Sequence, residues 1–424
     1  MAARTTVQRK RQPAPGPRIG LALAGGGPIG AIYEIGALCA LEDAITGLDF
    51  TALSGYVGVS AGGFIAASLA NGLSPSALCA AFIENVGGAD DPIAPNLFTR
   101  PAWGEYAHRL AMAPSVLAHA AGQVLSGRAT LPSLMAEASR LLPTGVFDNR
   151  PLEAHLAQLF SQPGRSNDFR QLARRLVIVA TDLDTGEAAP FGQPGWDDTP
   201  IARAVIASAA LPGLFPAVEI AGRSYVDGAL KKTMHATVLL DEGLDLLFCL
   251  NPLVPFDSTR QATRQHGRAA PAIPRLTDAG LPALMSQTFR SLIHSRLELG
   301  MKGYETSHPG CDILLFEPDH ADAAMFHAGT FSYAARKQMA NHAFQQTRRL
   351  LRVQQAPLET TLARHGLSLN VQRLHEPRQL IAGLPEAPHS PADALVHRAH
   401  EALDGLAHWV DTRPSNHRRA RSLS

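Results

Sequence analysis

The sequence predicts an α/β fold in which a mainly parallel central sheet lies between covering helices. Of the 424 residues, 46% are apolar and 18% are charged, which is typical of a folded chain with a large core. From Arg18 to about Asn251, short apolar runs alternate with helical patterns, and this order builds parallel sheets. The apolar runs are continuous, as in strands that are buried on both faces.

The elements follow in order along the first half of the chain. Strands are predicted at "IGLALA" (19–24), "GYVGV" (55–59), "RLVIVATDL" (175–183) and "DLLFCLNPL" (245–253). Apolar residues at helical spacing predict a helix over 31–44. A second helix, built of small residues over 61–72, ends at Asn71-Gly72.

The remaining segments are distinguished by composition. An Ala-, Leu- and Pro-rich stretch predicts a helical insertion, with a lid and ordinary helical packing as the two alternatives. A single amphipathic helix is predicted over 330–355, packed on the core, and there is no internal repeat. We therefore expect a flexible basic tail (1–17), an α/β domain (18–255) with the helical insertion (88–145), a surface loop (256–280), a helical C-terminal region packed on the domain (281–410), and a disordered basic tail (411–424).

Charge and cysteine content exclude several classes of protein. The net charge is only +1, so no overall field attracts nucleic acid. The four cysteines form no C-x-x-C pair, which favours free thiols in a reducing compartment. The uncharged stretch over 19–33 is interrupted by Gly25 to Gly27 and Pro28 and is too short to span a bilayer. We expect a cytoplasmic protein that is not transmembrane, with a mitochondrial-type presequence as the minor alternative.

A G-x-S-x-G pattern marks the first candidate site residue. Gly58-Val59-Ser60-Ala61-Gly62 lies between a predicted strand and a predicted helix, as a nucleophile elbow requires. In such an elbow the backbone of the serine is strained, and its hydroxyl stands above the sheet. Gly58 and Gly62 let the strand and the helix pass closely. The pattern alone is weak evidence, and its position between strand and helix strengthens it.

The glycine-rich loop "GGGPIG" over 25–30 permits more than one interpretation. Its glycines satisfy the dinucleotide spacing G-x-G-x-x-G, with Glu42 or Asp43 as the acidic residue. However, both acids fall inside a helical pattern, whereas a dinucleotide fold places that residue at the end of a second strand. A phosphate-binding P-loop is excluded because no Gly-Lys-Ser/Thr follows. We favour an oxyanion hole, in which amides at Gly26 and Gly27 bind a developing negative charge.

A serine nucleophile needs a base. The downstream histidines include His235, His266, His294, His308 and His327. None of these lies at the end of an evident late strand, so each is more simply explained as a surface or helix residue. In "GRSYVDGAL" (222–230), a short strand ends at Asp227-Gly228. Such a carboxylate can be presented to a neighbouring loop, although an ordinary Asp-Gly turn is the simpler alternative.

These motifs together resemble the patatin-like phospholipase family over roughly residues 18–255. The resemblance rests on five blocks in the order of the family: "GGGPIG", "GVSAG", "ATDLDTGE" (180–187), "AVIASAALPGLFPAVEIAGRSYVDGAL" (204–230) and "NPLVPF" (251–256). It implies a three-layer α/β/α fold and a lipid acyl hydrolase with a Ser–Asp dyad. By position, it assigns Ser60 as nucleophile, Asp227 as base with Gly228 supporting its motif, and Gly25, Gly26 and Gly27 as the oxyanion loop.

The resemblance also implies the partners of the chain. It predicts a lipid substrate at a membrane or lipid-particle surface, no metal and no organic cofactor. The insertion at 88–145 is a candidate wall for an apolar groove that holds the acyl chain. One position departs from the family, because Ile29 stands where a basic residue is frequent; this weakens the expectation of anionic head groups. The alternatives are a lipid-surface scaffold that keeps the hydrolase fold and, more remotely, a nucleotide-binding oxidoreductase.

Overall fold

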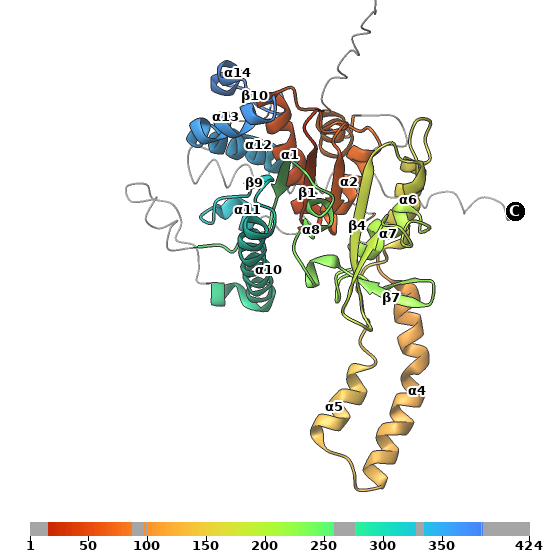
Figure 1. Ribbon diagram of the computed structural model, residues 1–424. Coiled ribbons are helices and arrows are strands. Elements are labelled where there is room, and N and C mark those ends of the chain that lie inside the picture. Colours follow the sequence, from red (N-terminus) through yellow and green to blue (C-terminus); the bar gives the residue numbers. More distant parts are fainter. Residues whose placement is uncertain are drawn as a thin grey trace, which may run out of the picture.

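The computed structural model describes residues 16–86, 97, 100–257, 276–327, 335–382 and 384. Within them, an eight-stranded sheet forms the centre of the molecule, in the order β6-β7-β4-β3-β1-β8-β9, with β5 paired to β4 (Figure 1). The parallel strands are β1 (Ile19–Leu23), β3 (Gly55–Gly58), β4 (Arg175–Asp182), β8 (Leu246–Leu250) and β9 (Asp312–Phe316). Antiparallel strands β5 (Ala188–Phe191), β7 (Arg223–Val226) and β6 (Val218–Ile220) complete the sheet.

All four predicted strands form, and the prediction of a mainly parallel sheet is confirmed. Within the predicted helical region over 281–410, the structure also has the strand β9, which pairs with β8 in the register Phe248↔Leu314. A short apolar run of this length fits a strand beside an open parallel edge better than a helix. The central sheet therefore extends beyond residue 255, the boundary that was predicted for the α/β domain.

Helices cover the sheet on both faces, because successive strand residues point to opposite sides. Leu21 and Leu23 of β1 pack in one apolar cluster with α1 (Gly27–Ala44), α2 (Ala61–Ala70) and α7 (Ile201–Ser208). Ala22 belongs to the other cluster, with side chains of α8 (Thr237–Leu240) and α10 (Gly280–Ser307). The result is a three-layer α/β/α arrangement, as predicted.

Shorter elements complete the body. They are α3 (Pro75–Leu78), a π-helical turn over Cys79–Glu84, α6 (Arg150–Phe160), α11 (Ala323–His327), α13 (Gln355–Arg364) and α14 (Val371–His375). Strand β10 (Ser368–Leu369) pairs with β2 (Ile45–Thr46) in a separate two-stranded sheet. Short 3₁₀ turns occur at Phe169–Gln171, Gly228–Leu230 and Leu276–Ala279.

The predicted helix over 330–355 appears as α12 (Arg336–Val353), with residues 328–334 outside the described part. It packs on α1 and buries Met339, Ala343 and Phe344. Gly36 of α1 faces the backbone of Ala340, and a Cβ at residue 36 would collide with that carbonyl. The glycine therefore permits the close approach of the two helices.

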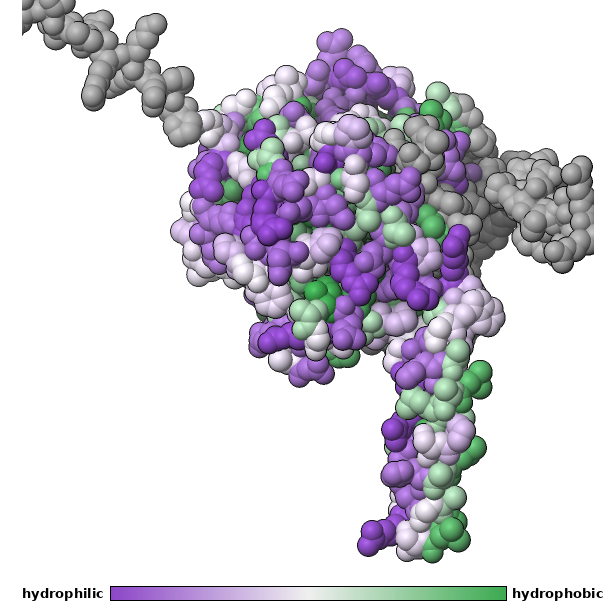
Figure 2. Space-filling model, turned by 90° about the vertical axis from the view of Figure 1, so that its right-hand side faces the viewer, coloured by the Kyte–Doolittle hydropathy of each residue, from purple (hydrophilic) through white to green (hydrophobic). Residues whose placement is uncertain are grey.

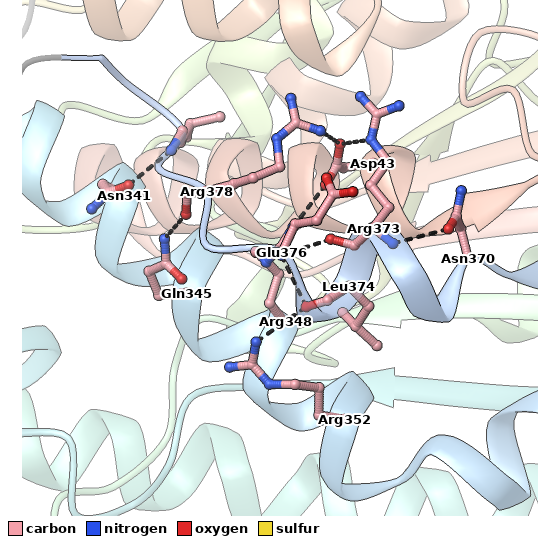
Figure 3. A network of polar contacts seen from close by, with 11 residues as sticks. Asp43, Asn341, Gln345, Arg348, Arg352, Asn370, Arg373, Leu374, Glu376 and Arg378 are labelled. Carbon is pink, nitrogen blue, oxygen red and sulfur yellow. Dashed lines mark hydrogen bonds and ion pairs between the residues drawn. The ribbon is translucent and has the colours of Figure 1, made fainter.

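An ion-pair network fixes the C-terminal helices to the end of α1 (Figure 3). The Asp43 carboxylate accepts hydrogen bonds from Arg348 (2.7 Å), Arg373 (2.7 Å) and Arg378 (2.6 Å). Arg348 is 1% exposed, and it also donates to the backbone carbonyls of Arg373, Leu374 and Glu376. One buried guanidinium thus joins α1, α12 and the chain after β10.

We expect Arg348→Ala to lower the free energy of unfolding by about 3–5 kcal/mol, because it removes one partner of a buried, hydrogen-bonded ion pair. Urea unfolding measures this loss. Arg349→Ala is the matched control, since Arg349 is the next residue of the same helix and is exposed; it should change stability by less than about 0.5 kcal/mol. Equal losses in the two variants would show that the network adds nothing.

Two helices project from the body as an arm, residues 103–142. Helices α4 (Trp103–Leu125) and α5 (Leu131–Ser139) form a hairpin that extends away from the sheet (Figures 1 and 2). It falls within the predicted insertion, of which residues 88–96, 98 and 99 lie outside the described part. In this arrangement the hairpin does not fold back over the body as a lid would. Among the described residues, no helix combines the length and apolarity needed to cross a bilayer.

Several predicted segments cannot be compared with the structure. The described part begins at residue 16 and leaves out residues 258–275 and 385–424. Most of the N-terminal tail, most of the loop predicted over 256–280 and the whole tail over 411–424 therefore remain predictions.

Candidate active site

Ser60 lies at the turn between β3 and α2. Its backbone has φ 54° and ψ −126°, a left-handed conformation that is strained for a residue with a Cβ. A Cβ at Gly58 would lie 2.5 Å from the carbonyl oxygen of Gly62, and one at Gly62 would lie 2.5 Å from that of Ala24. Both glycines are therefore required by the closeness of strand and helix, as the elbow pattern predicted.

A second serine holds this turn in place. The backbone amide of Ser60 donates to Ser208 Oγ (2.8 Å), and Ser208 Oγ donates to the carbonyl of Val179 (2.6 Å). Ser208 is the last residue of α7 and is fully buried. The sequence analysis did not single it out, although a serine within the small apolar run "AVIASAA" is the signal that could have indicated it.

Asp227 follows β7 and is buried near the end of β3, the strand that Ser60 follows. Its amide donates to the carbonyl of Ala210 (3.1 Å), and its own carbonyl accepts from Thr181 Oγ1 (3.1 Å). Carboxylate oxygen Oδ1 accepts the amide of Ala229 (2.9 Å). Gly228 runs so close to the Val179 carbonyl that a Cβ would collide with it. The Asp-Gly pair is thus a fixed part of the core rather than a surface turn.

The structure brings Ser60 and Asp227 together. The Ser60 side chain is near enough to the Asp227 carboxyl to lower its pKa, and because a carboxylate can only accept, the hydroxyl is the donor of the pair. Burial raises the pKa of Asp227 to about 6, while the Ala229 amide and the Ser60 side chain lower it by less. A buried carboxylate of raised basicity, close to a hydroxyl on a strained turn, can accept the proton of that hydroxyl at neutral pH.

The glycine loop borders the same pair. A Cβ at Gly25 would lie 2.8 Å from Cβ and 3.4 Å from Oγ of Ser60, so only glycine leaves the hydroxyl room. Gly27 has φ 60° and begins α1. Within the described residues, the amides of Gly25, Gly26 and Gly27 donate no backbone hydrogen bond, as is usual where a helix begins. These amides are available to an anion beside Ser60.

Pro252, which the sequence analysis did not identify as a site residue, supports this loop. A Cβ at Gly26 would lie 2.7 Å from the Pro252 ring, and one at Gly30 would lie 3.1 Å from it. Ile29, the position that departs from the family pattern, is buried in the core cluster on the α1 side of the sheet.

The dinucleotide interpretation of the loop is not supported. Asp43 lies in α1, and both of its carboxylate oxygens accept hydrogen bonds from arginines. Glu42 is in the same helix. The acidic residue that would bind a ribose is therefore occupied or misplaced. The loop lies beside Ser60 instead.

His235 is not part of the site, and His266 and the side chain of His327 lie outside the described part. His235, predicted to be a surface or helix residue, is instead buried in a loop with φ 51°. Its Nε2 lies 3.3 Å from the Gly228 carbonyl, and burial lowers its pKa to about 4. It is therefore a neutral structural residue behind the Asp-Gly turn.

One cluster of side chains has donors suited to a metal ion. Among the described residues, His294, Glu317 and His320 bring ligand atoms within 4.8 Å of one another. His294 Nε2 lies 3.5 Å from Glu317, and its Nδ1 lies 3.7 Å from Glu298. Hydrogen bonding to Glu317 raises the pKa of His294. His294 thus lies between two carboxylates of the chain itself, and these contacts require no ion.

One family model and several solved structures are similar to this chain. The family model "Patatin-like phospholipase" matches residues 21–240. Among solved structures, VipD from Legionella pneumophila is similar at 16% identity and a TM-score of 0.32, covering 78% of this chain and 68% of VipD. Full-length ExoU from Pseudomonas aeruginosa, solved with SpcU, is similar at 18% identity and a TM-score of 0.26, covering 68% of this chain and 53% of the other.

No curated protein gave a significant match. The family match spans more than half of the chain and contains the glycine loop, the elbow and the Asp-Gly turn. The chain thus belongs to the patatin-like phospholipase family, a family of lipid hydrolases.

Proposed function

We propose that the protein is a serine lipid acyl hydrolase in which Ser60 is the nucleophile and Asp227 the base. The observation that carries the proposal is the meeting of Ser60, the glycine loop and Asp227, a buried carboxyl whose pKa is raised. The strain at Ser60 adds support, because strained residues concentrate at functional sites. A scaffold that had lost catalysis would gain stability by losing both the strain and the buried charge.

The reaction proceeds in two stages. Ser60 Oγ attacks the ester carbonyl carbon while its proton passes to Asp227, and the carbonyl oxygen becomes an oxyanion bound by the glycine-loop amides. Collapse of this intermediate breaks the ester C–O bond, and the leaving alcohol takes the proton from Asp227. Water then attacks the acyl-Ser60 ester, giving its proton to Asp227, and the fatty acid leaves as Ser60 regains a proton.

The proposed substrate is a carboxylic ester of phospholipid, lysophospholipid or another lipid, reached at a membrane, lipid-particle or polyester-inclusion surface. The mechanism uses side chains and backbone amides alone. The four cysteines are free, which supports a place in the reducing cytoplasm.

Labelling with a fluorophosphonate probe tests the proposal, because only an activated serine reacts. The folded wild-type protein should label at Ser60 and hydrolyse p-nitrophenyl acyl esters. A folded protein that neither labels nor hydrolyses any lipid ester would instead be the scaffold alternative.

The pH dependence of catalysis follows from the state of Asp227. Its pKa is raised to about 6, and the protonated acid cannot accept the serine proton. We expect kcat/KM for a short p-nitrophenyl ester to fall below about pH 6, by about tenfold for each pH unit. Circular dichroism at each pH serves as the control for folding. A rate that stays level well below pH 6 while the protein remains folded would exclude Asp227 as the base.

A further inference from the structure

The arm carries an apolar stripe that it cannot bury itself. On α4 the exposed residues Trp103, Leu110, Leu117 and Val124 recur every seven positions, which places them along one line of the helix. Leu131, Met135 and Leu142 continue the exposed apolar surface along α5 and the turn after it, and Figure 2 shows apolar residues along one edge of the arm. No residue of α5 is buried.

The arm also has a distinct distribution of charge. Residues 110–127 contain no Asp, Glu, Lys or Arg. Near the base of the arm, Glu105 pairs with Arg109, and Glu137 with Arg140. At the tip, Arg128 forms no ion pair with the described residues and lies between Leu125 and Leu131, which are 89% and 74% exposed. A cation beside apolar side chains suits the boundary between head groups and acyl chains.

The base of the arm is joined to the segment that supports the candidate site. The amide of Phe147 donates to the carbonyl of Leu214 (2.8 Å), and Gly145 bridges to Gly213. Leu214 follows closely on Ala210, whose carbonyl accepts the amide of Asp227. The arm is therefore fixed to the segment over 210–214, which also holds Asp227.

We propose that the arm docks the protein on the surface of a lipid bilayer. In this arrangement the stripe lies in the interfacial layer, Arg128 contacts anionic head groups, and the edge that carries Ser60 and Asp227 is held near the membrane. The inference rests on the proposed function, because that function identifies the bound surface as lipid. It adds the arm as the part of the chain that binds this surface.

A second copy of the chain is a poorer occupant. A two-helix seam needs apolar residues at two positions of each heptad, whereas on α4 only the line through Trp103 and Leu110 repeats a large exposed apolar residue in every heptad. The positions four residues after Trp103, Leu110 and Leu117 are Ala107, Pro114 and Ala121. A single apolar line with a basic tip fits a membrane surface better than a helical partner.

The test is flotation of the full chain with vesicles of phosphatidylcholine, with and without phosphatidylglycerol. Leu117→Asp should weaken vesicle binding by about tenfold or more, because a charge replaces an inserted apolar side chain. The ratio of vesicle-phospholipid hydrolysis to p-nitrophenyl butyrate hydrolysis should fall in parallel. Arg128→Gln should reduce binding only to the vesicles that contain phosphatidylglycerol. Val353→Asp, an equally exposed apolar position on the body, is the matched control and should bind as the wild type does.

The outcomes separate this inference from the proposed function. Unchanged vesicle binding by Leu117→Asp overturns the docking role, even if the esterase remains active. A protein without esterase activity that still binds vesicles through the arm overturns the proposed function and leaves the docking role standing. A dimer in analytical ultracentrifugation that Leu117→Asp dissociates, without vesicle binding by the wild type, would make the stripe a contact between copies.

Discussion

Ser60→Ala is expected to lower kcat for hydrolysis of p-nitrophenyl acyl esters by about 10⁴-fold or more, the size of loss that follows removal of a serine nucleophile. The residual rate should reflect binding and the glycine-loop amides alone. Steady-state kinetics with mass-verified protein measures the change, and fluorophosphonate labelling should disappear with it.

The control for this variant is Ser54→Ala. Ser54 is exposed and lies just before β3, whereas Ser60 lies just after it. Loss of its hydroxyl should leave kcat and KM within about twofold of wild type, as is usual for surface changes. If Ser60→Ala kept the wild-type rate, the nucleophile would have to be another residue.

Asp227→Asn is expected to reduce activity and raise stability at the same time. Without a base, kcat should fall by about 10⁴-fold. The folded pKa of about 6 lies above the ordinary value of 3.8, so the folded protein holds this proton more tightly than the unfolded chain does. The stability that the proton provides is complete below about pH 4 and is lost as the pH rises through about 6.

The cost of the carboxylate above that pH is about 3 kcal/mol. Asparagine carries no charge and can still accept the amide of Ala229, so Asp227→Asn should be more stable than wild type at pH 8 and nearly equal to it at pH 4. Urea unfolding at the two pH values measures the difference. Asp184→Asn, at an exposed position, should give no such pH-dependent gain. If Asp227→Asn were less stable than the wild type at pH 8, this would contradict the claim that the wild-type protein buries a charged carboxylate.

Much of the fold was predictable because local signals agreed with tertiary packing. Continuous apolar runs marked β1, β3, β4 and β8, which are buried on both faces. The G-x-S-x-G pattern marked the turn at Ser60 because glycine is required where strand and helix pass closely. Strand β9 was missed because its five residues follow a long helical pattern, and only the neighbouring edge of β8 makes them a strand.

What the sequence did not indicate depends on contacts between distant residues. Ser208 supports Ser60 from 148 positions away, and Arg348 reaches Asp43 across 305 positions. No periodicity reports such pairs. Glu34 is a further case: it ends an uncharged stretch in the sequence but is fully buried, and burial raises the pKa of its carboxyl well above the ordinary value. The amphipathic pattern of 103–142 indicated helices but not that they would leave the body.

The most direct measurement of the central claim is mass spectrometry of the protein quenched in acid during turnover of a p-nitrophenyl acyl ester. Transfer of the acyl group to Ser60 predicts a mass increase of one acyl group on the peptide that contains this residue, absent from Ser60→Ala. Acylation of a different residue, or continued turnover by Ser60→Ala, would contradict the account.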